Sequence, residues 1–427
     1  MKFTRTFVLG IDGLPYSWVS SKLSDVWMPN LFKLCKQGSI KRISSVIPTI
    51  SSVAWTSYAT GENPGEHNIY GFVDRCPNPL KMSIPTSRDR KRKTIWDRLS
   101  AQGMKVIVIN VPLTYPPEAV NGKMVSCFLC TNLEKGTFPR DFYKYLRSKG
   151  YVIDADTWKA KDSRKEFLDE LFTIMKKRFE ITFDLMVKED WDFFQLHIME
   201  TDRLFHFFWD DIMSNSCLSE RVDEFFRELD LHIGELLERL PHYTRLIILS
   251  DHGFCGIKYE CNLNIWLQQQ GFLKFNDNVE KRLNNYHEDT LCYSLLPGRI
   301  YLNLKGREEH GTVEQKDYSR VRELIRDKLL QLKSPDGTEH VVEKVFFKED
   351  LYSGHYLYNA PDIIAHPHRG YDLKGAFSGS LFTRSHLNGM HTYDDAVIIG
   401  RNEDIAGVES IMDVAERILG GKVNDSI

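Results

Sequence analysis

The chain has 427 residues, enough to bury a large hydrophobic core, and its 42% hydrophobic and 12% aromatic content is that of a globular protein. A net charge of −3 gives no basic surface, so a nucleic acid polymer is not an expected partner. No apolar run reaches the length of a signal peptide or a membrane span, so we expect a soluble, cytoplasmic protein without a membrane span. The sequence does not indicate an oligomeric state.

The first predicted elements alternate between strand and helix. Phe7–Ile11 is an apolar run that predicts a buried strand, and Asp12 stands at its end. Thr94–Gln102 has a helical pattern that stops at Gly103, and Lys105–Asn110 predicts a second buried strand.

The same alternation continues toward the C-terminus. The predicted elements are a helix over 163–188, a strand at Asp192–Ile198, a helix at Leu218–Leu240, strands at Arg245–Leu249, Asp362–Ala365 and Ala396–Ile399, and a last helix at Ile411–Leu419. Strands that alternate with helices predict an α/β fold, with a mostly parallel central sheet covered by helices on both faces. Residues 265–355 are more polar and break the alternation, so we expect an inserted subdomain there within a single domain over 1–427.

The eight cysteines are scattered along the chain. Cys127 and Cys130 form a CxxC pair, but no second pair follows at the spacing of a zinc site. Without an export signal, we expect all of them to be free thiols.

Acids and histidines follow the predicted strands at the point where each strand ends. Asp12 follows the first strand, Asp251 and His252 follow Arg245–Leu249, and Asp202 lies shortly after Asp192–Ile198. Because parallel strands end at the same edge of a sheet, these three acids should lie together. Two histidines extend the set: His206 lies four residues after Asp202, on the same face of a helix, and His391 precedes the strand at Ala396–Ile399.

Each of these residues also has a purely structural interpretation. Asp251 and Asp202 could cap helices, His206 lies in an aromatic run typical of a core, and His391 alone is undecided. Taken together, three strand-end acids with histidines in reach exceed what packing requires. Mixed histidine and carboxylate ligands suit zinc first, then manganese or iron.

A nucleophile candidate lies in the segment Pro48–Gly61, which predicts a loop, a short helix and a glycine stop. Ser51 at the helix start would face free backbone amides and the positive end of the helix dipole, a setting that binds phosphate. The alternative is that Ser51 or Ser52 is simply an N-cap.

In this order, the motifs resemble those of the alkaline phosphatase superfamily, in particular its type I phosphodiesterase/nucleotide pyrophosphatase branch. The resemblance spans nearly the whole chain and rests on these elements: Asp12, Pro48-Thr-Ile-Ser51, Thr60-Gly61-x2-Pro64-x2-His67, Asp202-x3-His206, Asp251-His252-Gly253 and Gly389-Met-His391. Within the superfamily, the chain is most similar to a group of predicted phosphohydrolases or phosphomutases, through Ala54-Trp55-Thr-Ser, Asn110–Pro117, Met199–Arg203 and Asn303–Arg307.

The resemblance implies a three-layer α/β sandwich and a site for two divalent metal ions, which we expect to be zinc, with manganese as the alternative. One ion would be held by Asp12, Asp251, His252 and the Ser51 oxygen, and the other by Asp202, His206 and His391. Ser51 would form a phosphoserine intermediate during phosphoryl transfer.

The sequence also departs from the family. Nucleotide pyrophosphatases carry an asparagine at a position that here is Phe72, and Asn68 is a poor substitute. The sulfatase C-x-P-x-R signature is absent. The first departure counts against a preference for nucleotide diesters, and the second counts against a sulfatase. From the ordered ligand set and Ser51 we expect a metal-dependent phosphohydrolase acting on a phosphodiester or pyrophosphate bond of a small-molecule phosphate ester. A phosphomutase or phosphomonoesterase is the alternative, and a non-catalytic metal-binding protein the third. Candidate substrate contacts are Trp55, Arg203, Arg384 and His386, each of which could equally be a core or solvated residue.

Overall fold

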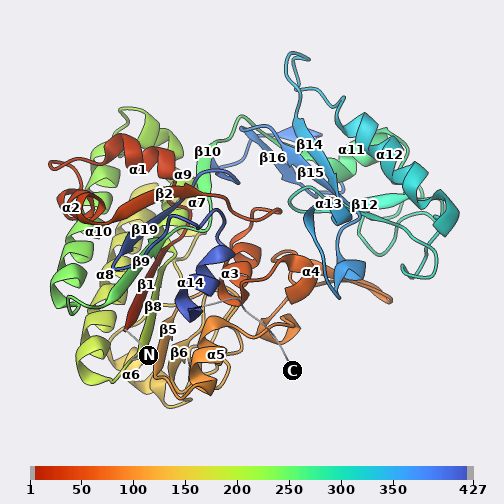
Figure 1. The fold of residues 1–427 in the computed structure, drawn as a ribbon. Helices are drawn as coiled ribbons and strands as arrows, with labels where there is room; N and C mark the ends of the chain where they lie inside the picture. Colours follow the sequence, from red (N-terminus) through yellow and green to blue (C-terminus); the bar gives the residue numbers. More distant parts are fainter. Residues whose placement is uncertain (1–4, 421–427) are drawn as a thin grey trace. The chain divides into compact units, whose positions relative to one another are not determined.

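The computed structural model describes residues 5–420, which fall into two compact units (Figure 1). The first unit comprises the described parts of 1–62, 86–255 and 391–427, and the second comprises 63–85 and 256–390. The chain therefore leaves the first unit and returns to it twice.

The first unit is built on a central sheet of eight strands. In spatial order these are β2 (Ser39–Ile43), β19 (Ala396–Arg401), β9 (Arg245–Leu249), β1 (Thr6–Ile11), β8 (Phe193–Ile198), β5 (Val106–Ile109), β6 (Gly122–Val125) and β7 (Thr137–Phe138). The inner strands β9, β1, β8, β5 and β6 run parallel to one another, whereas β19 runs antiparallel to β9, and β7 runs antiparallel to β6. β1, β8 and β9 are almost wholly buried, as expected for parallel strands with both faces covered.

Strand direction decides which residues gather at one edge. β9, β1 and β8 are adjacent and parallel, so the residues after Leu249, Ile11 and Ile198 share the carboxyl edge of the sheet. Because β19 is antiparallel, its beginning at Ala396, rather than its end, lies at that same edge. The segment before β19 therefore joins the strand ends.

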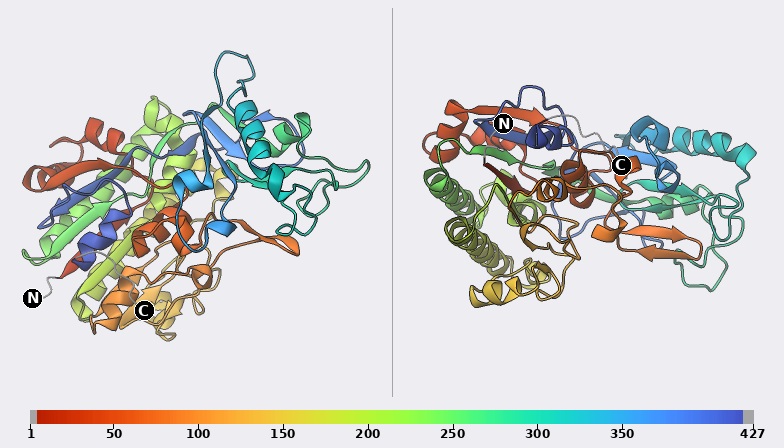
Figure 2. Two further views of the ribbon diagram at one scale, coloured as in Figure 1. Left: turned by 45° about the vertical axis from the view of Figure 1, so that its right-hand side comes forward. Right: turned by 60° about the horizontal axis from the view of Figure 1, so that its bottom comes forward.

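Helices cover both faces of this sheet (Figures 1 and 2). On one face α2 (Pro29–Gln37), α8 (Arg164–Lys188), α9 (Glu200–Met213) and α10 (Ser219–Arg239) pack together, and on the other α3 (Ser51–Thr60), α5 (Ile95–Ala101) and α14 (Asp413–Leu419) do. Shorter helices of the unit are α1 (Tyr16–Lys22), α6 (Phe142–Ser148) and α7 (Lys159–Asp162). The predicted α/β fold with a mostly parallel sheet is confirmed, and all the strands and helices predicted in this unit are present.

The second unit contains an antiparallel sheet in the order β12 (Cys292–Leu295), β13 (Arg299–Leu302), β15 (Ile363–Pro367) and β14 (Val342–Phe347). Further strands are β16 (Tyr371–Lys374), β11 (Tyr259–Asn262), β17 (Phe382–Thr383) and the hairpin β3 (Asp74–Pro77) and β4 (Leu80–Ser83). Its helices are α4 (Pro64–His67), α11 (Leu263–Gln269), α12 (Tyr318–Leu329) and α13 (Lys348–Leu351). These elements enclose a hydrophobic core of their own.

This unit includes more of the chain than the insertion predicted at 265–355, because it also contains 63–85 and extends to residue 390. The strand predicted at Asp362–Ala365 belongs to its sheet. Ion pairs between residues far apart in the sequence join the segments of this unit. Arg75 on β3 forms a buried ion pair of 2.7 Å with Glu308, and Arg307 forms a partly buried one of 2.6 Å with Asp362, before β15. The Asn303–Arg307 motif thus has a structural role here.

A buried ion pair fixes the start of α9 in the first unit. Arg178 on α8 donates to Glu200 at 2.8 Å and to the hydroxyl of Tyr151 at 2.8 Å, and neither charged side chain is more than 1% exposed. Glu200 is the first residue of α9, so this pair holds the helix turn that carries Asp202.

We expect Arg178→Met to lower the free energy of unfolding by about 3–5 kcal/mol, because it leaves the Glu200 carboxylate buried and unpaired. Lys177→Met is the matched control: the neighbouring Lys177–Glu180 pair is exposed, and such pairs contribute about 0–1 kcal/mol. Urea denaturation followed by circular dichroism measures both. Equal losses in the two variants would contradict the assignment.

Candidate active site

The candidate residues lie at the carboxyl edge of the central sheet, as predicted. Asp12 directly follows β1, and Asp251 and His252 directly follow β9. Asp202 and His206 lie on α9, after β8, and His391 lies on β18 (Gly389–Thr392), shortly before β19. Ser51 begins α3, whose preceding loop follows β2.

Asp12, Asp251 and His252 form a first cluster that is fully buried. The Nε2 atom of His252 lies 3.3 Å from Asp251 Oδ2 and 3.6 Å from Asp12 Oδ1. The Ser51 hydroxyl lies 3.2 Å from Asp12 Oδ1 and 3.4 Å from His252 Nε2. The hydroxyl therefore faces the same small space as the three other side chains.

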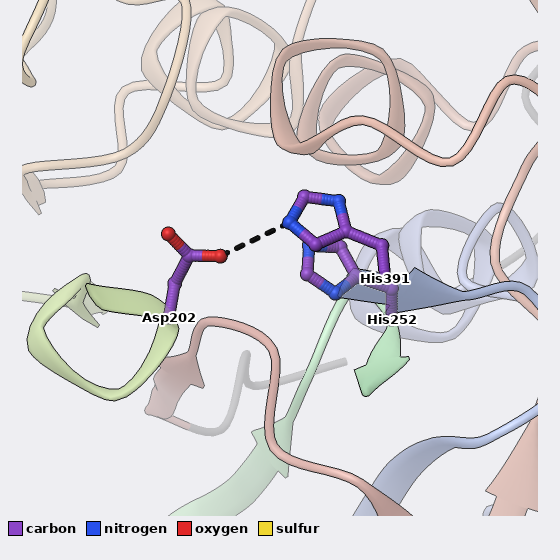
Figure 3. Close-up of side chains that lie close together, drawn as sticks. All are labelled: Asp202, His252 and His391. Atoms are coloured by element: carbon purple, nitrogen blue, oxygen red, sulfur yellow. Dashed lines mark hydrogen bonds and ion pairs between the residues drawn. The ribbon is translucent and has the colours of Figure 1, made fainter. Parts of the chain in front are cut away.

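Asp202, His206 and His391 form a second cluster beside the first (Figure 3 shows Asp202 with His391 and His252). His391 Nε2 lies 3.2 Å from Asp202 Oδ1 and 2.9 Å from His206 Nε2, and His206 Nε2 lies 3.4 Å from the same Asp202 oxygen. The rings of His252 and His391 stack with centroids 3.6 Å apart, so the two clusters are contiguous. The two histidine side chains of the second cluster are 17–20% exposed, so this cluster is the more accessible one.

In each of the three carboxylates, protein donors occupy one oxygen and leave the other facing a cluster. Asp12 Oδ2 accepts a hydrogen bond of 2.9 Å from Trp55 Nε1, Asp251 Oδ1 accepts one of 3.1 Å from the backbone N–H of Gly13, and Asp202 Oδ2 accepts one of 3.2 Å from Arg203 Nη1. Asp251 Oδ2 is buried and has no hydrogen-bond donor among residues 5–420. One inward oxygen per carboxylate is the arrangement expected of metal ligands.

Hydrogen bonds to carbonyl oxygens set the tautomers of two histidines. His252 Nδ1 lies 3.1 Å from the Gly253 carbonyl oxygen, and His391 Nδ1 lies 3.0 Å from that of Thr49. A carbonyl oxygen only accepts, so each Nδ1 carries a proton, and in the neutral ring the lone pair of Nε2 faces the clusters. Such a carbonyl partner on the far nitrogen is typical of metal-binding histidines.

The clusters differ in charge balance. In the first, burial lowers the pKa of His252 to about 3, and burial together with the charge of Asp12 raises the pKa of Asp251. In the second, burial opposes ionisation of Asp202, but the charges of His206, His391 and Arg203 outweigh it and lower the pKa of Asp202. The first cluster thus concentrates carboxylate oxygens without a cationic side chain, and a divalent cation would supply the missing positive charge.

The structural alternatives for the candidate residues can be compared with their positions. The N-cap of α3 is Ile50, and Ser51 is the first helical residue, without a capping hydrogen bond from its side chain. The N-cap of α9 is Met199, so Asp202 is not a cap either. Gly61 ends α3 in the left-handed conformation, with φ of 73°, as the predicted glycine stop requires.

Sequence reasoning missed His197, a buried residue of β8 whose Nε2 lies 3.0 Å from Asp12 Oδ2. The available signal was a histidine within the mostly apolar strand Phe193–Ile198, since a buried polar side chain needs a partner. Trp55, a candidate substrate contact, is instead fully buried and bound to Asp12.

The other candidate substrate contacts have different surroundings. Arg203 is tied to Asp202 and, at 2.8 Å, to Asp154 Oδ2, so it orients a cluster residue. Arg384 and His386 are exposed residues of the second unit, and the Arg384 guanidinium lies over the ring of Tyr259. All eight cysteines lie within the described residues and are free thiols.

The fold is alkaline-phosphatase-like, with a mostly parallel sheet covered on both faces and with acids and histidines gathered at its carboxyl edge. A family model described as type I phosphodiesterase/nucleotide pyrophosphatase matches residues 6–394. The chain belongs to this family, and it is a hydrolase acting on phosphoric ester bonds. A comparison with curated protein sequences found no match.

Solved structures share the fold over nearly the whole chain. Phosphonoacetate hydrolase from Sinorhizobium meliloti 1021, in complex with phosphonoacetate, has a TM-score of 0.66 at 15% identity and covers 98% of this chain and 96% of its own. Murine ectonucleotide pyrophosphatase/phosphodiesterase 5 has a TM-score of 0.57 at 13% identity. The human protein has a TM-score of 0.58 at 16% identity, and both comparisons cover 98% of this chain and 96% of the other. Between residues 5 and 420, none of the helices combines the length and the apolar character needed to cross a bilayer.

Proposed function

We propose that this protein cleaves a phosphodiester or pyrophosphate bond of a small-molecule substrate, with Ser51 as the nucleophile and a phosphoserine intermediate. The observation that supports this most directly is the position of the Ser51 hydroxyl, within 3.2–3.4 Å of Asp12 and His252. A buried serine in contact with a carboxylate and an unprotonated imidazole nitrogen is placed to lose its proton when it attacks.

The donor set fits two divalent ions. Asp12, Asp251, His252 and the Ser51 oxygen would hold one, and Asp202, His206 and His391 the other; we infer zinc, with manganese as the alternative. When bound, such ions supply positive charge that favours the serine alkoxide and stabilises the departing oxygen.

The protein's own residues would carry out two displacements at phosphorus. First, Ser51 Oγ forms a bond to phosphorus while the bond to the leaving oxygen breaks, and that oxygen departs with the electron pair. The first backbone amides of α3, which have no acceptor within the helix, are available to a phosphate oxygen. A water molecule then forms the second bond to phosphorus and releases Ser51, which takes back a proton. Two inversions give net retention of configuration.

Removal of divalent ions with a chelator is expected to abolish turnover of bis-p-nitrophenyl phosphate, and Zn²⁺ or Mn²⁺ should restore it. Ca²⁺ should not, because it prefers oxygen ligands and each proposed site includes imidazole. p-Nitrophenyl phosphate and phosphonoacetate are assayed in parallel. Faster turnover of the monoester would replace the diesterase proposal by a phosphomonoesterase, and isomerisation of a phosphate ester without phosphate release would indicate a mutase. Full activity after chelation would contradict metal dependence.

A further inference from the structure

His197 and Trp55 converge on one oxygen of Asp12. Asp12 Oδ2 lies 3.0 Å from His197 Nε2 and 2.9 Å from Trp55 Nε1, and all three side chains are fully buried. The other oxygen, Oδ1, faces Ser51 and His252. The two ring nitrogens therefore divide Asp12 into an oxygen bound within the protein and an oxygen that faces the first cluster.

The strand beneath Asp12 is built to admit both rings. Gly10 is paired with His197 in the sheet, and a Cβ atom at residue 10 would lie 2.7 Å from the Trp55 ring and 2.8 Å from His197 Nδ1. Any side chain there would displace one of the two rings, so only glycine fits. The rings also contact each other edge to face, with centroids 4.5 Å apart.

Of the two nitrogens of His197, only Nε2 has a partner. Nδ1 is buried and has no hydrogen-bond partner among residues 5–420. Since an ionised carboxylate can only accept, Nε2 must carry the proton, and His197 acts as a donor to Asp12. Retaining a buried imidazole with one unsatisfied nitrogen costs free energy, which a merely space-filling side chain would avoid.

We propose that His197 and Trp55 are positioning residues: they hold Asp12 Oδ2 so that Oδ1 is fixed as a single-oxygen ligand of the ion in the first cluster. The inference rests on the proposed function. Without the two donors, the carboxylate could rotate or bind the ion through both oxygens, and the contact between Oδ1 and Ser51 would be lost. The second cluster contains none of these residues and should be unaffected.

Isothermal titration of the chelated full-length protein with Zn²⁺ and with Mn²⁺ tests the proposal. We expect two binding steps in the wild type. His197→Phe, which keeps the ring but loses the donor, should weaken one step about 10–100-fold and leave the other unchanged. His197→Gln, whose amide N–H can replace Nε2–H, should recover most of the affinity. In an Asp12→Ala background, His197→Phe should have no further effect on the affinity.

Tyr58→Phe is the matched control. Tyr58 lies on the same helix as Trp55 and bonds Gln195 at 3.2 Å, a buried residue of β8 on the same strand face as His197. This variant also loses a buried hydrogen bond, and its metal-free melting temperature should fall, but both binding steps should stay unchanged.

The outcomes separate the two hypotheses. If the wild type binds two ions and turns over substrate, while His197→Phe binds them with wild-type affinity, the positioning role is wrong and the proposed function stands. A loss of affinity in Tyr58→Phe equal to that in His197→Phe also overturns it. If the wild type binds no divalent ion, the proposed function fails as well.

Discussion

Ser51→Ala is expected to reduce turnover of the preferred phosphate ester by at least about 10³-fold, because no other group can form the covalent intermediate. The substitution removes only the hydroxyl oxygen, which lies 3.2 Å from Asp12 and 3.4 Å from His252, so the fold should be preserved. Initial rates with saturating Zn²⁺ or Mn²⁺ provide the measurement. Acid quenching during turnover, followed by mass spectrometry, should detect a phosphoryl group on Ser51 of the wild type, still bearing the substituent that did not depart from a diester, and none on the variant.

Ser52→Ala is the closest control for this substitution. Ser52 is the next residue of α3 and is fully buried, but its hydroxyl has no hydrogen-bond partner among residues 5–420. Turnover should stay within a few-fold of the wild type. If Ser51→Ala retained activity, or if both alanine variants lost it equally, Ser51 would not be the nucleophile.

Asp251→Asn is expected to change activity and stability in opposite directions. It removes a proposed metal ligand, so turnover should fall at least about 10²–10³-fold. The metal-free protein, however, should melt at a higher temperature than the metal-free wild type. Burial and the Asp12 charge both raise the pKa of Asp251, so holding it ionised at neutral pH opposes folding, and a neutral amide removes that penalty. Differential scanning calorimetry in a chelator measures the shift.

Asp230→Asn provides the comparison at a buried carboxylate outside the site. Asp230 accepts hydrogen bonds from the backbone N–H groups of Asn30 and Leu31 at 3.0 and 2.8 Å, so its charge is already satisfied. This variant should lower the melting temperature and leave metal binding intact. A lower melting temperature for both variants would show that Asp251 is stabilised by the protein alone, without a requirement for a cation.

Within the central sheet β1, β5, β8, β9 and β19 could be predicted from the sequence because they are mostly apolar runs, whereas the short or polar strands β2, β6 and β7 could not. Arg245–Leu249 matches the prediction residue for residue, and Phe7–Ile11 within one residue. Apart from the strand predicted at Asp362–Ala365, the sheet of the second unit could not be predicted, because it contains strands such as Cys292–Leu295 and Arg299–Leu302, each of four residues. Runs this short carry no decisive periodicity, and their pairing depends on segments far apart in the chain.

The candidate site was predictable to the extent that it depends on strand ends. Asp12, Asp202 and Asp251 follow strands that were expected to be parallel, so the sequence placed all three at one edge of the sheet, and the pairing of β1 with β8 and β9 brings them together. The role of His197 could not be predicted, because it depends on the strand register that pairs it with Gly10. It also depends on the packing of α3, which brings the Trp55 ring against Gly10. Such three-way contacts leave no pattern in a single sequence.

The path of the chain has a consequence for how such proteins diversify. His252 lies just before the chain enters the larger segment of the second unit, and His391 is the first residue after it returns. The stacked rings of these residues therefore lie where the two ends of this long segment come close together. A segment whose two ends lie close together can be lengthened, shortened or exchanged at little cost in loop-closure entropy to the rest of the fold. Chimaeras that carry residues 63–85 and 256–390 of a relative are therefore expected to keep both clusters of candidate ligands, which lie outside these segments.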